Sequence, residues 1–208
     1  MEPREVRLHN LFQTYGKTII LPYDQGLEHG PQDFFNARHA ENPFHIIDIA
    51  KKGRYNAVAL HIGNAKRHFK DTYDQVPLVL KVNGKTGIPS DDEPLSPITA
   101  TIDEALRLSA IAVGYTLYIG SPRQDEDFEQ FTYVREEAHS AGLPVIVWSY
   151  PRGREIEEKG GKNSLCIRAG GSGFIFGRNI WQRPVDQALD ITRKLKEVIR
   201  TQRQKKQR

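Results

Sequence analysis

The sequence has few of the features that cross-link a small secreted protein or anchor a chain in a membrane, namely cysteine and long apolar stretches. Cys166 is the single cysteine among 208 residues, so no internal disulfide can form. No stretch approaches the roughly 18 consecutive apolar residues of a membrane-spanning helix, and the opening residues have no apolar core like that of a secretory signal. We therefore expect a cytoplasmic protein that has no membrane among its partners.

A net positive charge is confined to one end of the chain. Residues 193–208 contain eight basic residues and one acid, a net charge of +7, while the other 192 residues together carry −3. Such a segment binds nucleic acid in some proteins, but it is also typical of a solvated helix end, where the macrodipole favours cations. It holds no aromatic residue that would stack on a base. Nucleic acid is therefore not an expected partner, and we predict one domain over 1–200 with a basic tail at 201–208.

Six short apolar runs divide the rest of the sequence. They are Thr18–Tyr23, Ala57–His61, Pro77–Val82, Ala112–Tyr118, Leu143–Tyr150 and Gly173–Phe176. The apolar residues in these runs are nearly continuous rather than alternating, which is typical of parallel strands covered by helices on both faces.

Helical segments are predicted between these strands. They are Pro43–Lys52, Thr101–Ala110, Glu126–Ala141 and Pro184–Arg200. Thr101 with Glu104 makes a capping-box pattern, and Gly142 follows the third helix at the position of a C-terminal cap. Alternation of this kind predicts an α/β fold with a parallel sheet. A doubly wound open sheet and an incomplete (βα)8 barrel both fit six strands, since a complete barrel has eight.

Polar side chains gather at the ends of four of the predicted strands or directly after them. They occur in Asp24–Pro31, Lys81–Thr86, Trp148–Gly153 and Gly177–Arg183. Binding and catalytic residues of parallel α/β folds lie at the carboxyl ends of the strands. The sequence therefore predicts one site built from these four segments.

The same segments carry a resemblance to a known family. The stretches LPYDQGLEHGP, LVLKVNGKT, AVGYTLYIGS, VIVWSYPRG and GFIFGRNIWQRP resemble, in this order, the archaeal-type class I fructose-bisphosphate aldolases. The resemblance implies a (βα)8 TIM barrel, a sugar phosphate as substrate and a homo-oligomer. It also implies Schiff-base chemistry, in which a lysine on the sixth strand condenses with a ketone, so that neither a cofactor nor a metal is expected.

The resemblance assigns catalytic positions residue by residue. It implies that Asp24 contacts substrate hydroxyls, that His29 belongs to the same loop, and that Trp148 and Tyr150 form the strand-five pair, with Tyr150 as general acid/base and Arg152 beside it. Taken alone, each residue has an ordinary structural interpretation. Asp24 also fits a turn before glycine, His29 a satisfied loop histidine, and the two aromatic residues a core rim.

The phosphate-binding positions implied by the resemblance are Gly177 and Arg178, although these also fit a simple strand-end turn. The sequence departs from the family at Gln25, where many members have histidine. It also departs at Ser109 and Ile111, which replace a glycine and an acidic residue before strand four. We interpret the last two differences as structural.

The largest departure follows VIVWSYPRG. Residues 153–172, which are 20 residues, separate this motif from GFIFGRNIWQRP. A single parallel crossover takes about a dozen residues or more, so we infer an internal deletion that removes family strands six and seven. The Schiff-base lysine is not identified. Lys159 and Lys162 lie in a polar, glycine-rich stretch, and Lys81 is considered as a replacement nucleophile.

Two arrangements of a barrel that lacks two strands are open. The last strand either pairs with strand five in a tighter, overpacked closure or leaves an open sheet with exposed edges. Either arrangement predicts low stability or self-association.

Two functions follow. The first is aldol cleavage of fructose 1,6-bisphosphate to dihydroxyacetone phosphate and glyceraldehyde 3-phosphate. The second is a non-catalytic homologue that binds a sugar phosphate or a full-length partner.

Overall fold

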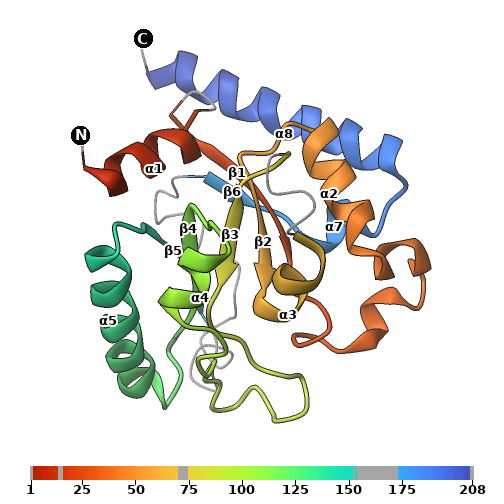
Figure 1. Cartoon of the computed structure of the whole chain (residues 1–208). Coiled ribbons are helices and arrows are strands. Elements are labelled where there is room, and N and C mark those ends of the chain that lie inside the picture. The colour runs from red at the N-terminus through yellow and green to blue at the C-terminus, as the bar shows by residue number, and fades with distance from the viewer. Residues whose placement is uncertain (1, 14–15, 70–74, 152, 154–172, 207–208) are drawn as a thin grey trace.

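The structure is a computed structural model that describes residues 2–13, 16–69, 75–151, 153 and 173–206. Its centre is a six-stranded sheet in the order β5-β4-β3-β2-β1-β6, with all five strand pairs parallel. The strands are β1 Thr18–Tyr23, β2 Ala57–His61, β3 Leu78–Lys81, β4 Ala112–Ile119, β5 Val145–Pro151 and β6 Gly173–Ile175. The sheet curls, and the longer helices lie outside it (Figure 1). All six predicted strands are confirmed, and β1 and β2 have the predicted bounds.

Helices and single turns connect the strands. The α-helices are α1 Pro3–Leu11, α2 Pro43–Lys52, α3 Ile62–Asn64, α4 Ile102–Arg107, α5 Gln124–Ser140, α7 Arg178–Trp181 and α8 Val185–Lys206. The short 3₁₀ turns are η1 Pro31–Phe34 and η2 Arg38–Glu41, and η3 Ala65–Phe69 is a π-helical turn. The helix predicted over 43–52 has the predicted bounds. The boundary predicted at residue 200 lies within α8.

The strands are buried on both faces, as their continuous apolar runs predict. Side chains of one parity, such as Leu21, Leu60 and Leu80, pack under the outer helices in the main core. Side chains of the other parity, such as Ile20 and Val79, form a second, smaller cluster on the concave face. Leu11 of α1, the only buried residue of its helix, belongs to this second cluster, so α1 closes one end of the concave face.

The helix ends follow the sequence signals. The side chain of Thr101 accepts from the backbone N–H of Glu104 at 3.1 Å, and the Glu104 carboxylate accepts from the N–H of Thr101 at 3.0 Å, which completes the predicted capping box. Gly142 ends α5 at φ 70°, in the left-handed region that glycine adopts without strain. Ser109 takes the same conformation after α4, at φ 55°. Ser109 therefore occupies a position that favours glycine, which supports the structural interpretation of this departure.

The sheet takes the open one of the two arrangements. β6 pairs with β1, where Thr18 stands opposite Gly173, and β5 pairs with β4. In the part of the chain that the structure describes, β5 and β6 thus form opposite edges of the sheet and do not pair with each other. The tighter six-stranded closure, in which the last strand pairs with β5, is therefore wrong.

The long helix α8 is fastened to the first half of the chain. The hydroxyl groups of Tyr55 and Thr192 lie 2.7 Å apart in a buried contact. The Lys196 ammonium donates to the carbonyls of Gly53 and Arg54 at 2.7 and 2.9 Å. These carbonyls follow the last turn of α2, so Lys196 ties α8 to the end of that helix.

Candidate functional site

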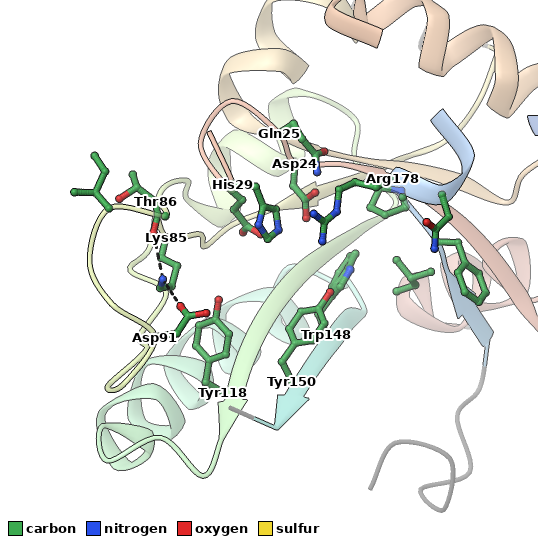
Figure 2. A pocket seen from close by; sticks show the side chains of 18 of the residues that line it. Asp24, Gln25, His29, Lys85, Thr86, Asp91, Tyr118, Trp148, Tyr150 and Arg178 are labelled. Carbon is green, nitrogen blue, oxygen red and sulfur yellow. Dashed lines mark hydrogen bonds and ion pairs between the residues drawn. The ribbon is translucent and has the colours of Figure 1, made fainter. Parts of the chain in front are cut away.

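A cavity of about 810 Å³ opens at the carboxyl ends of the strands. Its walls come from the segments after β1, β3 and β6 and from the ends of β4 and β5 (Figure 2). The lining residues are Pro22, Asp24, Gln25, Glu28, His29, Lys85, Thr86, Gly87, Ile88, Pro89, Ser90, Asp91, Tyr118, Trp148, Tyr150, Ile175, Phe176, Gly177, Arg178, Asn179 and Gln182. The four polar segments that the sequence places at the carboxyl ends of the strands therefore meet around one cavity.

The cavity brings together six of the seven predicted site residues. They are Asp24, His29, Trp148, Tyr150, Gly177 and Arg178. The seventh, Arg152, lies outside the described residues, as do Lys159 and Lys162. The clustering shows that these positions share a site, while their individual roles stay predictions.

Trp148 and Tyr150 are two residues apart on β5, so their side chains lie on the same face of the strand, and both face the cavity (Figure 2). Trp148 is only 5 % exposed and packs in the concave cluster, whereas Tyr150 is 39 % exposed at the rim. Gly114 of β4 makes room for the indole, because a Cβ there would lie 2.4 Å from the Trp148 ring. Trp148 is thus a core aromatic residue and a cavity wall at once, and Tyr150 presents its ring to the open space.

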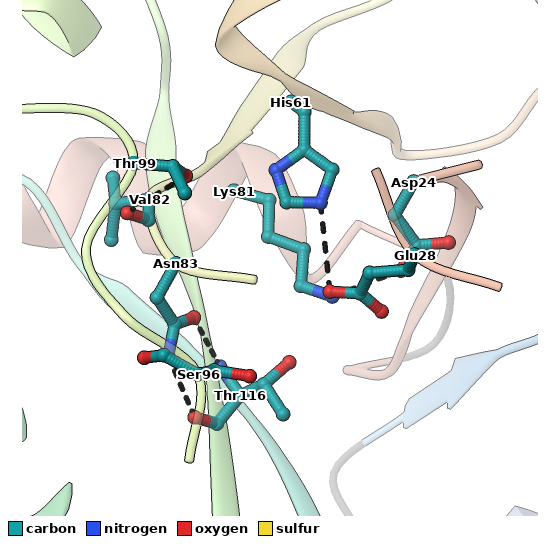
Figure 3. Close-up of polar contacts among 9 residues, drawn as sticks. All are labelled: Asp24, Glu28, His61, Lys81, Val82, Asn83, Ser96, Thr99 and Thr116. Carbon is teal, nitrogen blue, oxygen red and sulfur yellow. Dashed lines mark hydrogen bonds and ion pairs between the residues drawn. The ribbon is translucent and has the colours of Figure 1, made fainter. Parts of the chain in front are cut away.

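Behind the cavity wall lies a buried charged cluster (Figure 3). The Lys81 ammonium donates to Asp24 Oδ2 at 3.0 Å and to Glu28 Oε1 at 2.5 Å. His61 Nε2 lies 3.5 Å from the same Glu28 oxygen. The Lys81 nitrogen also sits 5.8 Å from the ring centroid of Trp148. Asp24 thus forms an ion pair with a residue 57 positions away in the sequence, in addition to any contact within its own turn.

The charges of this cluster stabilise one another. Burial by itself would raise the pKa of Asp24, but the Lys81 ammonium outweighs it and holds this pKa below its ordinary value. Burial would likewise lower the pKa of Lys81, yet the carboxylates of Asp24 and Glu28 raise it well above the ordinary lysine value. Lys81 is therefore a cation at neutral pH. A Schiff-base amine must be uncharged to attack a ketone, so this geometry speaks against Lys81 as the replacement nucleophile.

Glu28 and His61 were not predicted from the sequence. Each nevertheless carried a usable signal, since Glu28 lies in the loop after β1 and His61 ends β2 just as Lys81 ends β3. His61 stands opposite Lys81 in the register of β2 against β3, which brings these two side chains together.

The loop after β1 is held in a strained and bonded form. His29 adopts φ 62°, an uncommon left-handed conformation for a residue other than glycine. Asp33 binds Arg178 Nη1 at 3.3 Å through one carboxylate oxygen and Gln25 Nε2 at 3.3 Å through the other. Its backbone carbonyl accepts from Gln182 at 2.8 Å. The loop after β1 is therefore tied to α7, and Gln25, the departure from the family, takes part in this tie.

The Arg178 guanidinium extends from the start of α7 toward Asp24 and His29 (Figure 2). Its side chain is 51 % exposed, so it is accessible to an anion in the cavity. Gly177 precedes it and closely approaches Pro22 of β1, where a Cβ would meet the backbone oxygen at 3.2 Å. These two residues therefore form the wall of the cavity opposite the loop of residues 85–91.

That opposite loop is anchored at its base. The Asn83 side chain donates to the carbonyls of Ser96 and Thr116 at 3.2 and 2.8 Å and accepts from the Thr116 N–H at 2.7 Å (Figure 3). At the rim, Lys85 pairs with Asp91 at 2.7 Å. The loop thus leaves and rejoins the sheet at one fixed place and presents Lys85 to the cavity.

The described residues contain no group of three or more histidine, cysteine, aspartate or glutamate side chains placed to hold a metal ion. Within the same residues, every helix is too short or too polar to cross a membrane.

Comparison with known proteins connects this chain to a family. Residues 18–168 match the DeoC/LacD family of aldolases. The chain is 39 % identical over 146 residues to the class 1 fructose-bisphosphate aldolase of Thermoproteus tenax, which covers 70 % of this chain and 54 % of the relative. It is 37 % identical over 154 residues to that of Halobacterium salinarum, covering 74 % and 58 %. The chain therefore spans little more than half the length of these relatives.

Solved structures agree. A Schiff-base-forming fructose-1,6-bisphosphate aldolase superposes with a TM-score of 0.78 at 29 % identity, over 94 % of this chain and 99 % of the other. An archaeal fructose 1,6-bisphosphate aldolase gives a TM-score of 0.76 at 29 % identity, over 93 % and 98 %. The open sheet is accordingly an incomplete barrel of the aldolase type, which decides against the doubly wound alternative. The chain belongs to the DeoC/LacD family of aldolases.

Proposed function

We propose that this chain is a class I fructose-bisphosphate aldolase that cleaves fructose 1,6-bisphosphate, or a closely similar phosphorylated sugar, into two three-carbon products. The observation that carries the proposal is the convergence of Asp24, Trp148, Tyr150 and Arg178 on one cavity at the carboxyl ends of the strands. Two relatives named as class 1 fructose-bisphosphate aldolases and two solved aldolase structures of the same fold support it.

The residues divide the work by their chemistry. An ionised Asp24 accepts hydrogen bonds from sugar hydroxyls. The Arg178 guanidinium binds a phosphate group through paired N–H donors. The Tyr150 phenol, exposed at the rim, moves a proton to or from the substrate oxygen when the carbon–carbon bond breaks or forms. Each assignment is a proposal that a single substitution can test.

The cleavage also requires an uncharged amine to form the Schiff base. Lys81 is held as a cation by two carboxylates, and Lys85 at the rim pairs with Asp91. The experiment that tests the function therefore has to identify the amine as well as detect it.

That experiment is a borohydride trap. The purified chain is incubated with dihydroxyacetone phosphate and reduced with borohydride, and its intact mass is measured by mass spectrometry. A full-length relative is treated in the same way as a positive control. An adduct of one substrate per chain, followed by peptide mapping, would establish the chemistry and name the amine among Lys85, Lys159, Lys162 and the remaining lysines. The absence of any adduct, while the relative is labelled, would overturn the catalytic proposal.

A second function is favoured by the ion-paired state of Lys81. If no adduct forms but fructose 1,6-bisphosphate binds in calorimetry, the chain is a sugar-phosphate-binding homologue rather than an enzyme. Arg178→Met would then weaken binding, because the guanidinium is the cation at that wall of the cavity. Lys194→Met, an exposed cation far along α8 that pairs with Asp190, is the matched control.

We also propose that the protein forms a homo-oligomer in the cytoplasm. Among the described residues, β5 and β6 each pair on one side alone, and this supports the proposal because unpaired strand edges favour association. Light scattering after gel filtration measures the mass directly, and a monomer at micromolar concentration would contradict the proposal.

A further inference from the structure

We propose that Lys81 is a positioning residue, whose ammonium fixes the Asp24 carboxylate in its ionised form at the cavity wall. This inference rests on the proposed function, since it explains how Asp24 is prepared to bind a polyhydroxylated sugar. It assigns a role to a buried lysine that the cleavage chemistry itself does not use.

The geometry places Lys81 at the junction of three strands. Its side chain is 1 % exposed, and its nitrogen contacts the carboxylates of Asp24, which follows β1, and of Glu28 in the same loop. The Trp148 ring from β5 covers the nitrogen on another side at 5.8 Å. Lys81 itself ends β3. An ammonium has three donors, so two carboxylate bonds and a ring face account for its surroundings.

The charge balance gives this arrangement its effect. Asp24 and Glu28 both contact the Lys81 nitrogen, at 3.0 and 2.5 Å, so this ammonium lies between the two carboxylates and favours the charged form of Asp24. His61 of β2 faces the same Glu28 oxygen at 3.5 Å. On the cavity side, the groups that face Asp24 are His29 and Arg178 (Figure 2), and the Arg178 guanidinium is already paired with Asp33.

Lys81 therefore supplies the buried positive charge that the two carboxylates require. The Asp24 oxygen Oδ2 binds Lys81, and the carboxylate as a whole lines the cavity. An ionised carboxylate held on one side by a fixed cation presents a pure hydrogen-bond acceptor on the other. Such an acceptor fits the hydroxyl groups of a sugar and disfavours a second carboxylate or a phosphate at the same spot.

The experiment reads the Asp24 carboxyl directly. Carbon-13 NMR of the chain labelled at aspartate carboxyl carbons follows Asp24 through pH, with Asp24→Asn used to assign the signal. In the native chain we expect the titration midpoint of Asp24 to lie below the ordinary aspartate value. In Lys81→Met we expect this midpoint to lie at least one pH unit above the midpoint of the native chain. Lys81→Arg keeps the charge and should restore a low midpoint. Lys85→Met, which removes a cation at the rim, should leave the Asp24 midpoint where it is.

A functional measurement accompanies the titration. We expect Lys81→Met to bind fructose 1,6-bisphosphate at least tenfold more weakly at pH 7 than the native chain, and Lys81→Arg to recover most of this loss. If the native chain binds no fructose 1,6-bisphosphate at all, the proposed function fails, whereas the midpoint of Asp24 still decides whether Lys81 positions it.

One further variant covers the case in which Lys81→Met does not fold. The double substitution Lys81→Met with Glu28→Gln removes one charge of each sign, so it leaves Asp24 as the one carboxylate without creating a pair of unbalanced charges. An Asp24 midpoint that stays below its ordinary value in the folded variant would overturn the inference. So would a borohydride adduct mapped to Lys81 itself, since a lysine that forms the Schiff base is not a fixed cation.

Discussion

Replacing Gly114 by alanine tests whether the packing of Trp148 shapes the cavity. Gly114 needs no unusual backbone conformation, because its φ is not among the positive values of the chain. The new Cβ would lie 2.4 Å from Cζ3 and 2.7 Å from Cη2 of Trp148. Ordinary contacts between carbon atoms begin near 3.5 Å, so the ring must withdraw by about 1 Å.

The size of the effect follows from this overlap. Overpacking a buried site costs about 1–3 kcal/mol. For a chain of this size, each kcal/mol lowers the melting temperature by about 2–4 °C, so we expect Gly114→Ala to melt about 2–12 °C below the native chain. A displacement of about 1 Å in a site wall lowers turnover by about 100-fold, and we expect a loss of that order in aldol cleavage.

The assay combines thermal unfolding with tryptophan fluorescence, corrected with a Trp148→Phe variant. Gly63→Ala is the matched control, because a Cβ at Gly63 meets nothing within 4 Å; it should not lower the melting temperature, since alanine is favoured over glycine in a helix by up to about 1 kcal/mol. If Gly114→Ala melts at the native temperature with unchanged Trp148 emission, the steric reasoning is refuted.

The remaining predictions concern stability. Ser109→Gly should raise the melting temperature by about 2–4 °C, because the left-handed conformation costs a side chain about 1 kcal/mol, while Gly142→Ala should lower it. Lys196→Met should cost about 1–2 kcal/mol in chemical denaturation by losing its two carbonyl contacts after α2. The folded pKa of Asp24 lies below its ordinary value of 3.8, so its stabilising contribution is complete above that pH and is lost as pH falls below it. Asp24→Asn should therefore show a flatter decline of melting temperature than the native chain as the pH falls below 3.8. If residues 201–208 form the proposed tail, their deletion should leave the melting temperature unchanged. Scanning calorimetry measures this directly.

The sequence was informative wherever a local pattern determined the structure. Continuous apolar runs located all six strands, and the bounds of β1 and α2 were predicted to the residue. The helix α1 was not predicted, because only Leu11 of its nine residues is buried and its apolar pattern is correspondingly weak. The short turns and α7 were also not predicted, since fewer than six residues give no measurable periodicity.

The site was predictable in outline for a different reason. The rule that strand ends meet at one edge brought Asp24, Trp148 and Tyr150 together correctly. The rule could not show that Glu28 and His61 would surround Lys81, because this depends on the register of β2 against β3 and on the curl of the sheet. It also could not show that Lys81 would be held as a cation, since that depends on burial and on distances between side chains.

The pairing of β6 with β1 has a consequence for the order in which the protein folds. The first four strand pairs join neighbours along the sequence, whereas Thr18 and Gly173 are more than 150 residues apart. Long-range pairing of this kind forms late and slowly. During synthesis, the strands that carry Lys81 and Asp24 can associate while the later residues are still being added. The wall that holds Arg178 arrives only with β6, so the charged cluster is built before the cavity that it serves.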